Sequence, residues 1–281
     1  MKRQQTQKTA VAIISVIAAI VVIPIFLVIA FMVYNGIGTL SWEFLTATPR
    51  NGMTEGGIFP AILGTIFLTF GTAIAAIPLG VGAAIYLAEY AGDNRLTRAI
   101  RLAIVNLAGI PSIVYGLFGL GMFVLFLNYG TSLLAGSLTL GLMTLPVVIS
   151  TAEEAILSVP QEFRMVSLSL GATRWQTIRN QVLPNALPGI ITGVILGLGR
   201  AAGETAPILF TVAAFYLPNL PQSVFDQSMA LPYHLFVIST QVPGMPLGIQ
   251  YGTALTLLFI VLSLTLVATL IRSSMRRRRE W

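Results

Sequence analysis

Several stretches of this chain contain no charged side chain and are long enough to cross a lipid bilayer. They include residues 9–42, 56–88, 102–152, 180–199 and 227–271, which are 34, 33, 51, 20 and 45 residues long. A membrane-spanning helix needs about 20 predominantly apolar residues. The whole chain is only 9% charged, whereas soluble domains carry about a quarter charged residues. These features predict an all-α membrane protein.

Six transmembrane helices fit into these runs. The longest run is too long for one span, and the turn-forming residues 128–130 (Asn-Tyr-Gly) divide it into two. The predicted spans cover about residues 10–33, 60–87, 102–126, 133–152, 184–210 and 249–271. We expect one six-span domain over residues 10–271, with a loop over 153–183, an N-terminal tail over 1–9 and a basic C-terminal tail over 272–281. The first span is too long to be a removed signal peptide.

The basic residues predict how the spans are oriented. With six spans both termini lie on one side, and 14 of the 16 lysines and arginines fall on that side. They are Lys2, Arg3, Lys8, Arg95, Arg98, Arg101, Arg164, Arg174, Arg179, Arg272, Arg276, Arg277, Arg278 and Arg279. Basic residues concentrate in cytoplasmic loops, so we expect both termini in the cytoplasm. The net charge of +6 is therefore a sign of topology and not of nucleic-acid binding.

The composition excludes several kinds of catalytic and metal site. The chain has no cysteine, a single histidine (His234) and two lysines, both near the N-terminus. It therefore lacks thiolate ligands, a histidine cluster and the lysine of a P-loop. The acidic pair Glu153-Glu154 has no base, nucleophile or metal ligand beside it in the sequence, so we expect no catalytic activity. We expect His234 to be a packed residue of an external loop.

The predicted spans are rich in glycine and proline. Pro24, Pro78, Pro111, Pro146, Pro188 and Pro207 fall in or at the edges of the spans. Gly193/Gly197 and Gly199/Gly203 place small residues four apart on the fifth span, which permits close contact between helices. Prolines are tolerated in a membrane bundle where neighbouring helices or internal water satisfy the freed carbonyl groups. Ordinary bundle packing explains each feature, but together they indicate a transporter more than a rigid anchor.

The predicted cytoplasmic loop before the fifth span carries apolar side chains at helical spacing. Val166 and Leu170 precede Gly171, and Trp175 and Ile178 follow it, with arginines between them. This spacing predicts two short amphipathic helices joined at the glycine. A short helix with an apolar face needs either a partner protein or the membrane surface. The residues alone leave both alternatives open.

The end of this loop resembles the EAA loop of ABC importer permeases. The shared features are Gly171, a spacing of nine residues and the sequence Gln181-Val-Leu183-Pro184, whereas the Glu-Ala-Ala triplet is replaced by Met165-Val166-Ser167. In that family the loop forms a coupling helix that docks into a groove on the cytoplasmic ATPase. The resemblance assigns ATPase coupling to Glu162, Arg164, Met165, Ser167, Gly171, Ala172, Thr173, Trp175, Leu183 and Pro184.

Three further segments resemble the membrane permeases of phosphate ABC importers of the PstA type. They are residues 54–65, 108–119 and 200–207, the last of which reads Arg-Ala-Ala-Gly-Glu-Thr-Ala-Pro. The resemblance implies a type I (MetI-like) permease bundle in the bacterial cytoplasmic (inner) membrane. It also implies a sister permease (PstC type), an ATPase dimer (PstB type), an extracellular phosphate-binding protein (PstS type) and inorganic phosphate as partners. ATP and Mg would be bound by the ATPase, so we expect no cofactor on this chain.

Arg200 is the residue of the fifth span whose chemistry is most informative. A guanidinium inside the membrane costs at least about 2.5 kcal/mol on insertion scales, so it should face protein or water. Its planar fork suits two oxygens of a phosphate, and Glu204, one helical turn away, can neutralise it. Either the two side chains pair to make each other's burial tolerable, or Arg200 lines a passage for phosphate. Thr205 and Ser112 would supply hydroxyl donors to that passage.

Three other functions remain as alternatives. An importer of another oxyanion, such as sulfate or molybdate, shares the composition, and the motifs above argue against it. An ion-coupled secondary transporter needs carboxylates inside the membrane, and Glu204 is the one clear candidate in the sequence, which has no evident internal repeat. A membrane enzyme would need a catalytic constellation that the sequence does not offer.

Overall fold

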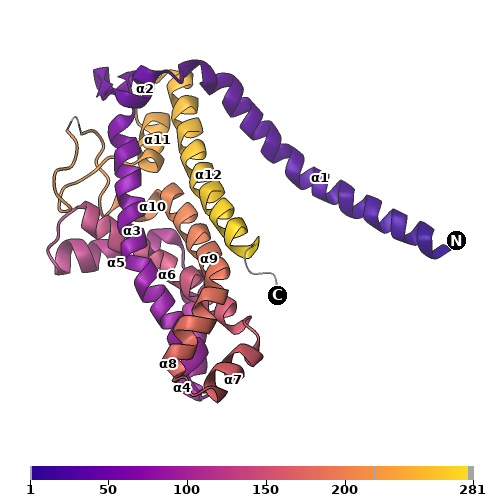
Figure 1. Cartoon of the computed structure of the whole chain (residues 1–281). Coiled ribbons are helices and arrows are strands. Elements are labelled where there is room, and N and C mark those ends of the chain that lie inside the picture. The colour runs from indigo at the N-terminus through magenta and orange to yellow at the C-terminus, as the bar shows by residue number, and fades with distance from the viewer. Residues whose placement is uncertain (1, 218, 278–281) are drawn as a thin grey trace.

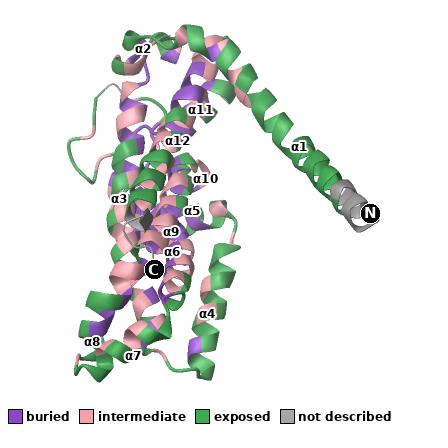
Figure 2. Ribbon diagram, turned by 45° about the vertical axis from the view of Figure 1, so that its right-hand side comes forward, coloured by how far each residue is buried: buried purple, intermediate pink, exposed green. Residues whose placement is uncertain are grey.

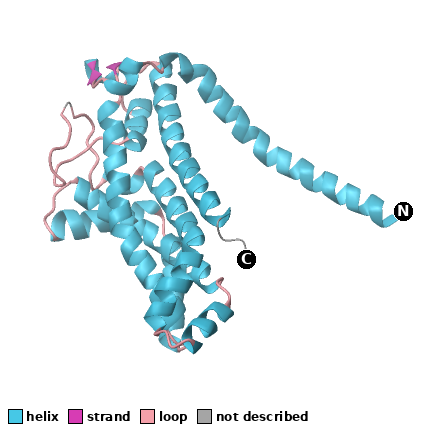
Figure 3. Cartoon of the chain, viewed as in Figure 1, coloured by secondary structure: helices cyan, strands magenta, loops and turns pink. Residues whose placement is uncertain are grey.

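The computed structural model describes residues 2–217 and 219–277, and nearly all of their regular structure is helical (Figure 3). The long helices are α1 (Lys2–Gly36), α3 (Phe59–Ile85), α6 (Leu133–Leu157), α9 (Leu183–Gly203) and α12 (Leu247–Arg277). Within the described residues, five helices are long and apolar enough to cross a membrane, and a bent pair brings the number to six if it counts as one crossing. The prediction of an all-α membrane protein is confirmed.

Short elements connect the long helices. The short α-helices are α2 (Trp42–Thr46), α4 (Arg95–Ala108), α5 (Ser112–Gly119), α7 (Gln161–Ser169), α8 (Arg174–Thr177), α10 (Ala206–Leu209) and α11 (Leu231–Thr240). The 3₁₀ turns are η1 (Ile37–Thr39) and η2 (Asn51–Met53), and the π-helical turns are η3 (Tyr86–Tyr90), η4 (Leu120–Phe126) and η5 (Ile178–Val182). Strands β1 (Pro49–Arg50) and β2 (Glu55–Gly56) form a small antiparallel pair. This pair and α2 lie at one end of the bundle, and α7 and α8 lie at the other (Figure 1).

The second, fourth and sixth predicted spans each correspond to one long helix. Helix α3 with η3 covers 60–87, α6 covers 133–152, and α12 covers 249–271. Helices α1 and α12 also include residues that we expected in tails, because α1 begins at Lys2 and α12 continues to Arg277. Met1 and residues 278–281 of the predicted tails lie outside the described residues.

The third predicted span is wrong as a single helix over 102–126. Helix α4 begins earlier, at Arg95, and ends at Ala108, and the pair formed by α4 and the segment 112–126 is bent by 101°. The bend contains Pro111, which has no N–H to continue the hydrogen-bond ladder. The hydroxyl of Tyr115 donates a hydrogen bond to the carbonyl of Leu107 at 2.9 Å and so bridges the two arms of the bend.

The fifth predicted span, 184–210, is wrong beyond residue 203. Helix α9 ends at Gly203, and Glu204 is extended, with φ −77° and ψ 133°. Pro207 explains the break, since it has no N–H to bond back into the last turn of α9. Residues 231–240, expected in an external loop, form helix α11, and His234 is buried there at 2% exposure.

Helix α6 lies at the centre of the bundle, where it packs against α3 and α9 and also contacts α4, α5 and α10. Glycines allow these contacts to be close. A side chain at Gly193 of α9 would collide with Thr151 of α6, and one at Gly80 of α3 would collide with Val148 of α6. Lipid tails are as apolar as leucine, so tight packing of this kind is what holds membrane helices together.

Helix α1 stands apart from this packed centre. Figure 2 shows that the described part of its surface is almost wholly exposed, whereas buried residues gather along the axis of the bundle. Helix α1 contacts α12 near its own C-terminal end. There the ring centres of Phe31 and Tyr251 lie 5.5 Å apart, edge to face, and Gly36 touches the backbone of Tyr251. The exposed apolar side chains of α1 suit a lipid environment.

The close contact between α9 and α6 predicts that Gly193→Ala destabilises the protein. An added Cβ would lie 1.7 Å from Thr151 Oγ1, and overpacking of this kind costs about 1–3 kcal/mol. The matched control is Gly199→Ala on the same helix, whose Cβ would meet Thr265 Oγ1 at an ordinary 3.6 Å. Thermal unfolding in detergent should show a lower midpoint for Gly193→Ala alone. Equal midpoints for the two variants would contradict the packing described here.

Candidate transport and coupling sites

Arg200 and Glu204 form an ion pair at the end of α9. Arg200 lies in the last turn of the helix, and its Nε donates a hydrogen bond to Glu204 Oε1 at 3.0 Å. The side chain of Arg200 is 46% exposed, whereas that of Glu204 is 17% exposed. The guanidinium therefore lies on an open face of the chain while the carboxylate is largely covered. The pairing expected from the sequence is present in the structure.

This ion pair uses one nitrogen of the guanidinium. Among the residues that the structure describes, the two terminal nitrogens of Arg200 have no hydrogen-bond partner. An arginine presents its donors in a planar fork that matches two oxygens of an anion. The geometry thus leaves the outer part of the fork available while Glu204 balances its charge.

Arg200 lies near the middle of the membrane-spanning bundle. Gly197, one turn earlier, packs against Thr144 and Val148 of α6. Gly197 is thus level with the middle of residues 144–148, and Arg200 lies three residues further from the 153 end of α6. At 1.5 Å per residue, the level of Arg200 is about 15 Å from that of Glu153. The hydrocarbon core of a bilayer is about 30 Å thick, and a charge at its centre has to face protein or water. The open face that carries Arg200 is therefore either covered by another protein or wet.

Thr205 and Ser112 flank this region without joining the ion pair. Thr205 immediately precedes α10, and Ser112 is the first residue of α5. These helices touch through Gly116, which fits against the first turn of α10. Tyr115, on the same helix as Ser112, lies within electrostatic range of Arg200. Thr205 and Ser112 are both partly exposed, and in the described part of the chain neither of these two side chains has a hydrogen-bond partner.

In the loop that the sequence predicts to couple to the ATPase, α7 and α8 meet at Gly171 as predicted. Gly171 has a φ of +83°, a left-handed conformation that strains any β-branched residue. No atom lies within 4 Å of the position that its Cβ would take, so the backbone conformation alone favours glycine. Thr173 begins α8 with a capping box, in which its side chain and that of Gln176 each accept from the other's backbone N–H. Two short helices joined at a glycine are confirmed.

Large apolar side chains of this segment are exposed to solvent. Leu170 is 83% exposed and Val166 is 61% exposed, and Met165 and Trp175 are each more than half exposed. An open groove of about 550 Å³ lies beside them, with walls that include Glu162, Phe163, Ser167, Ala172 and Gln181. Clusters of exposed apolar side chains mark interaction surfaces. We call the exposed side chains of residues 161–176 the α7–α8 surface.

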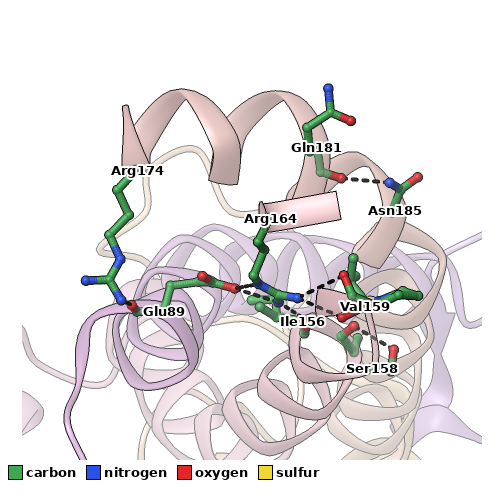
Figure 4. Close-up of polar contacts among 10 residues, drawn as sticks. Glu89, Ile156, Ser158, Val159, Arg164, Arg174, Gln181 and Asn185 are labelled. Carbon is green, nitrogen blue, oxygen red and sulfur yellow. Dashed lines mark hydrogen bonds and ion pairs between the residues drawn. The ribbon is translucent and has the colours of Figure 1, made fainter. Parts of the chain in front are cut away.

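Three of the predicted coupling residues are engaged in contacts with other parts of this chain. Arg164 is only 14% exposed and pairs with Glu89 at 2.7 Å, as Figure 4 shows. The hydroxyl of Ser167 lies 2.9 Å from that of Thr177 and ties α7 to α8. Leu183, in the first turn of α9, packs against the apolar cluster between α3, α6 and α9. Pro184 follows it and is partly buried.

A family model described as "Binding-protein-dependent transport system inner membrane component" matches residues 76–280, which include Arg200 and the α7–α8 surface. The chain belongs to this family. Its members are membrane components of transport systems that work with a binding protein. The loop's likeness to the EAA loop and the family match therefore agree.

Named relatives match most of this permease. The "Probable ABC transporter permease protein YqgI" of Bacillus subtilis (strain 168) is 36% identical over 253 residues, which are 86% of this chain and 86% of the relative. The "Phosphate transport system permease protein PstA 1" of Mycobacterium tuberculosis (strain ATCC 25618 / H37Rv) is 39% identical over 226 residues, which are 80% of this chain and 72% of the relative. A chain of the MetNI methionine ABC transporter in an inward facing conformation superposes with a TM-score of 0.63 and 17% identity, over 76% of this permease and 94% of that chain. The predicted MetI-like permease fold is confirmed.

Two ion pairs of this permease that join residues far apart in the sequence are not predicted by the sequence. Besides Glu89–Arg164, Arg101 pairs with Glu153 at 2.7 Å and donates to the carbonyl of Leu87 at 3.0 Å. In the sequence, Glu89 and Glu153 mark only the ends of charge-free runs. The signal that could have found them is an acid directly at the end of a span, opposite in charge to the arginines of the neighbouring loops.

Proposed function

We propose that this permease is one of two membrane subunits in an ATP-driven, binding-protein-dependent importer of inorganic phosphate. The observation that carries the proposal is Arg200, a half-exposed guanidinium near the middle of the bilayer with a single bond to Glu204. Relatives that are named as phosphate transport permeases support the choice of phosphate. They include proteins that are 39% and 32% identical over 80% and 93% of this chain.

Arg200 and Glu204 would act together as a transient site for phosphate. Glu204 neutralises the guanidinium in the empty passage and lowers the cost of holding a charge in the membrane. The free terminal nitrogens of Arg200 donate to the arriving anion, and Thr205 and Ser112 add hydroxyl donors. The carboxylate repels the same anion, so binding stays weak. A weak site suits a passage, because an ion that binds too tightly does not leave.

The α7–α8 surface would couple the permease to a cytoplasmic ATPase. Leu170, Met165 and Trp175 give it an apolar character that a partner protein can cover. The assembly that we propose contains a sister permease (PstC type), two ATPase subunits (PstB type) and an extracellular binding protein (PstS type). ATP and Mg bind to the ATPase, and this chain contributes no catalytic residue.

Transport of a charged solute requires alternating gates. A pore open at both ends would let phosphate move down its own electrochemical gradient, so uptake needs one side closed at a time. Closure of the ATPase subunits would move the α7–α8 surface and swing the bundle from inward-facing to outward-facing. The binding protein would then release phosphate to the passage that contains Arg200.

We also infer that both termini and the α7–α8 end of the bundle face the cytoplasm of a bacterial cell. Helices α1 and α12 both run away from the α2 end (Figure 1), and basic residues gather at the α7–α8 end. A reporter fused after Trp281 should therefore behave as cytoplasmic, and one inserted near Asn219 as external. A cytoplasmic signal from the Asn219 insertion would contradict this orientation.

A double variant separates the two roles open to Arg200. In Arg200→Gln with Glu204→Gln no unpaired charge remains in the membrane, so the complex should assemble. If Arg200 guides phosphate, uptake should fall about ten-fold or more, because a hydrogen bond to a charged group contributes about 1.5–3 kcal/mol. Arg200→Lys keeps the charge but loses the fork and should retain part of the activity. The measurement is ATP-dependent phosphate uptake at matched membrane abundance.

The matched control removes an exposed ion pair of the same kind. Arg98 Nη2 and Asp93 Oδ2 lie 2.9 Å apart, and the two side chains are 68% and 72% exposed. Exposed pairs of this kind contribute little to stability. Arg98→Gln with Asp93→Asn should therefore transport normally. Near-normal uptake by the Arg200/Glu204 double variant would show that these two side chains serve only to neutralise each other.

A further inference from the structure

We propose that Glu89 and Arg164 form a mechanical clamp that passes movement of the α7–α8 surface to helices α3 and α6. Glu89 lies on the π-helical turn η3 at the end of α3, and Arg164 lies on α7. They are positioning residues, since they touch neither phosphate nor ATP. The inference rests on the proposed role of the α7–α8 surface and adds how its displacement reaches the transmembrane helices.

Arg164 joins three elements through one side chain. Its Nε and Nη2 donate to Glu89 Oε1 at 3.0 and 2.7 Å. It also donates to the carbonyl oxygens of Ile156 at 2.9 Å and Val159 at 2.7 Å, at the end of α6 (Figure 4). These carbonyls belong to the last turn of a helix or follow it, where no intrahelical donor remains. The guanidinium therefore fastens α7 to both α3 and α6.

A second arginine ties α8 to the same turn. Arg174 donates a hydrogen bond to the backbone carbonyl of Glu89, and its guanidinium lies 5.1 Å from the ring centre of Tyr90. Glu89 thus receives one arginine on its carboxylate and another on its carbonyl oxygen. Both helices of the α7–α8 surface converge on η3, a π-helical turn of the kind often found at functional sites.

The clamp matters because, apart from its three-residue link to α6, α7 has little other attachment to the bundle. None of its described residues is fully buried, and Phe163 is its one described apolar side chain that packs against the buried cluster between α3, α6 and α9. Helix α8, in contrast, continues through η5 into α9, which carries Arg200. Without the clamp, a push on the surface would reach α9 through η5 and α6 through the short link 158–160, but α3 only through side-chain packing. With it, the three helices move as one unit.

Burial makes the ion pair effective. The side chains of Glu89 and Arg164 are 8% and 14% exposed, so water and salt screen them less than an exposed pair. A buried pair fixes geometry strictly, but removing one partner leaves an uncompensated charge. A useful test therefore removes both charges together.

The test is a coupling measurement on the whole complex in proteoliposomes, with the sister permease, the ATPase subunits and the binding protein. The variant is Glu89→Gln with Arg164→Gln, and the matched control is the exposed pair Arg98→Gln with Asp93→Asn. ATP hydrolysis and phosphate uptake are measured on the same vesicles. We expect the clamp variant to assemble and hydrolyse ATP, while phosphate imported per ATP falls about ten-fold, within the usual range of coupling between sites.

Arg164→Lys provides a graded variant. Lysine keeps the positive charge but lacks the planar fork that reaches Glu89 and two carbonyl groups at once. Its ratio of phosphate to ATP should fall between those of the wild type and the double variant. The control pair should keep the wild-type ratio. A normal ratio in the clamp double variant would overturn the proposal, and so would its failure to assemble, which would assign the pair to folding instead of transmission.

A separate variant tests the surface on which the clamp depends. Gly171→Val strains the turn between α7 and α8, whereas Gly171→Asn tolerates the left-handed conformation. If the α7–α8 surface binds the ATPase, Gly171→Val should lose the ATPase subunits on purification and Gly171→Asn should keep them. If Gly171→Val loses the ATPase subunits while the clamp variant imports the normal amount of phosphate per ATP, the clamp proposal alone is overturned. Normal binding and transport by Gly171→Val would overturn the coupling surface and the clamp with it.

Discussion

Close packing of α6 against its neighbours is the constraint on which the other features depend. Hydrophobic burial does not distinguish a neighbouring helix from lipid, so association relies on shape and close approach. Gly80 and Gly193 let α3 and α9 approach α6 until any added side chain would collide. Helices α4, α5 and α10 also contact α6. The bundle is therefore held from the inside, and its outer faces are left for lipid or partner chains.

A firmly packed centre permits helices to break where function needs it. The bend at Pro111 and the end of α9 at Gly203 both leave backbone groups outside regular helices, and such groups are tolerated only inside protein or beside water. Tyr115 satisfies one carbonyl at the first break. At the second, the break leaves Glu204 largely covered and Arg200 open. The position of the charged pair thus follows from where α9 stops.

The same packing gives a route for movement between the two sites. Helix α9 begins beside the α7–α8 surface and carries Arg200 in its last turn, while Arg164 fastens that surface to α3 and α6. A displacement at one end of such a unit is carried to the other as a rigid-body motion and not lost in local bending. In the function that we propose, coupling and passage are therefore two ends of one packed body.

Much of this organisation is readable from the sequence, and the exceptions have physical causes. Charge-free runs located α3, α6 and α12, because lipid excludes charge along a whole span. They could not locate the breaks at Pro111 and Gly203, since a bent helix and a straight one are equally apolar. Helical spacing predicted the pair of Arg200 with Glu204, four residues apart.

Contacts between residues far apart in the sequence could not be predicted from the spacing of residues. Glu89 and Arg164 are 75 residues apart, and a π-helical turn, which no local pattern announces, places Glu89 at the interface. The turn at Gly171 was predictable, because the apolar spacing on either side of it indicated two short helices joined at that glycine. The apolar run over 231–240 gave no sign that it forms a helix packed inside the bundle, since the charge-free stretch around it continues unbroken into α12.

The most direct test of the central claim is transport by the purified assembly. Proteoliposomes that contain this permease, the sister permease and the ATPase, with ATP inside and the binding protein outside, are given labelled phosphate. Our account predicts uptake that requires both ATP and the binding protein and that excess sulfate does not reduce. Uptake without ATP, or import of sulfate or molybdate at the same rate as phosphate, would contradict it.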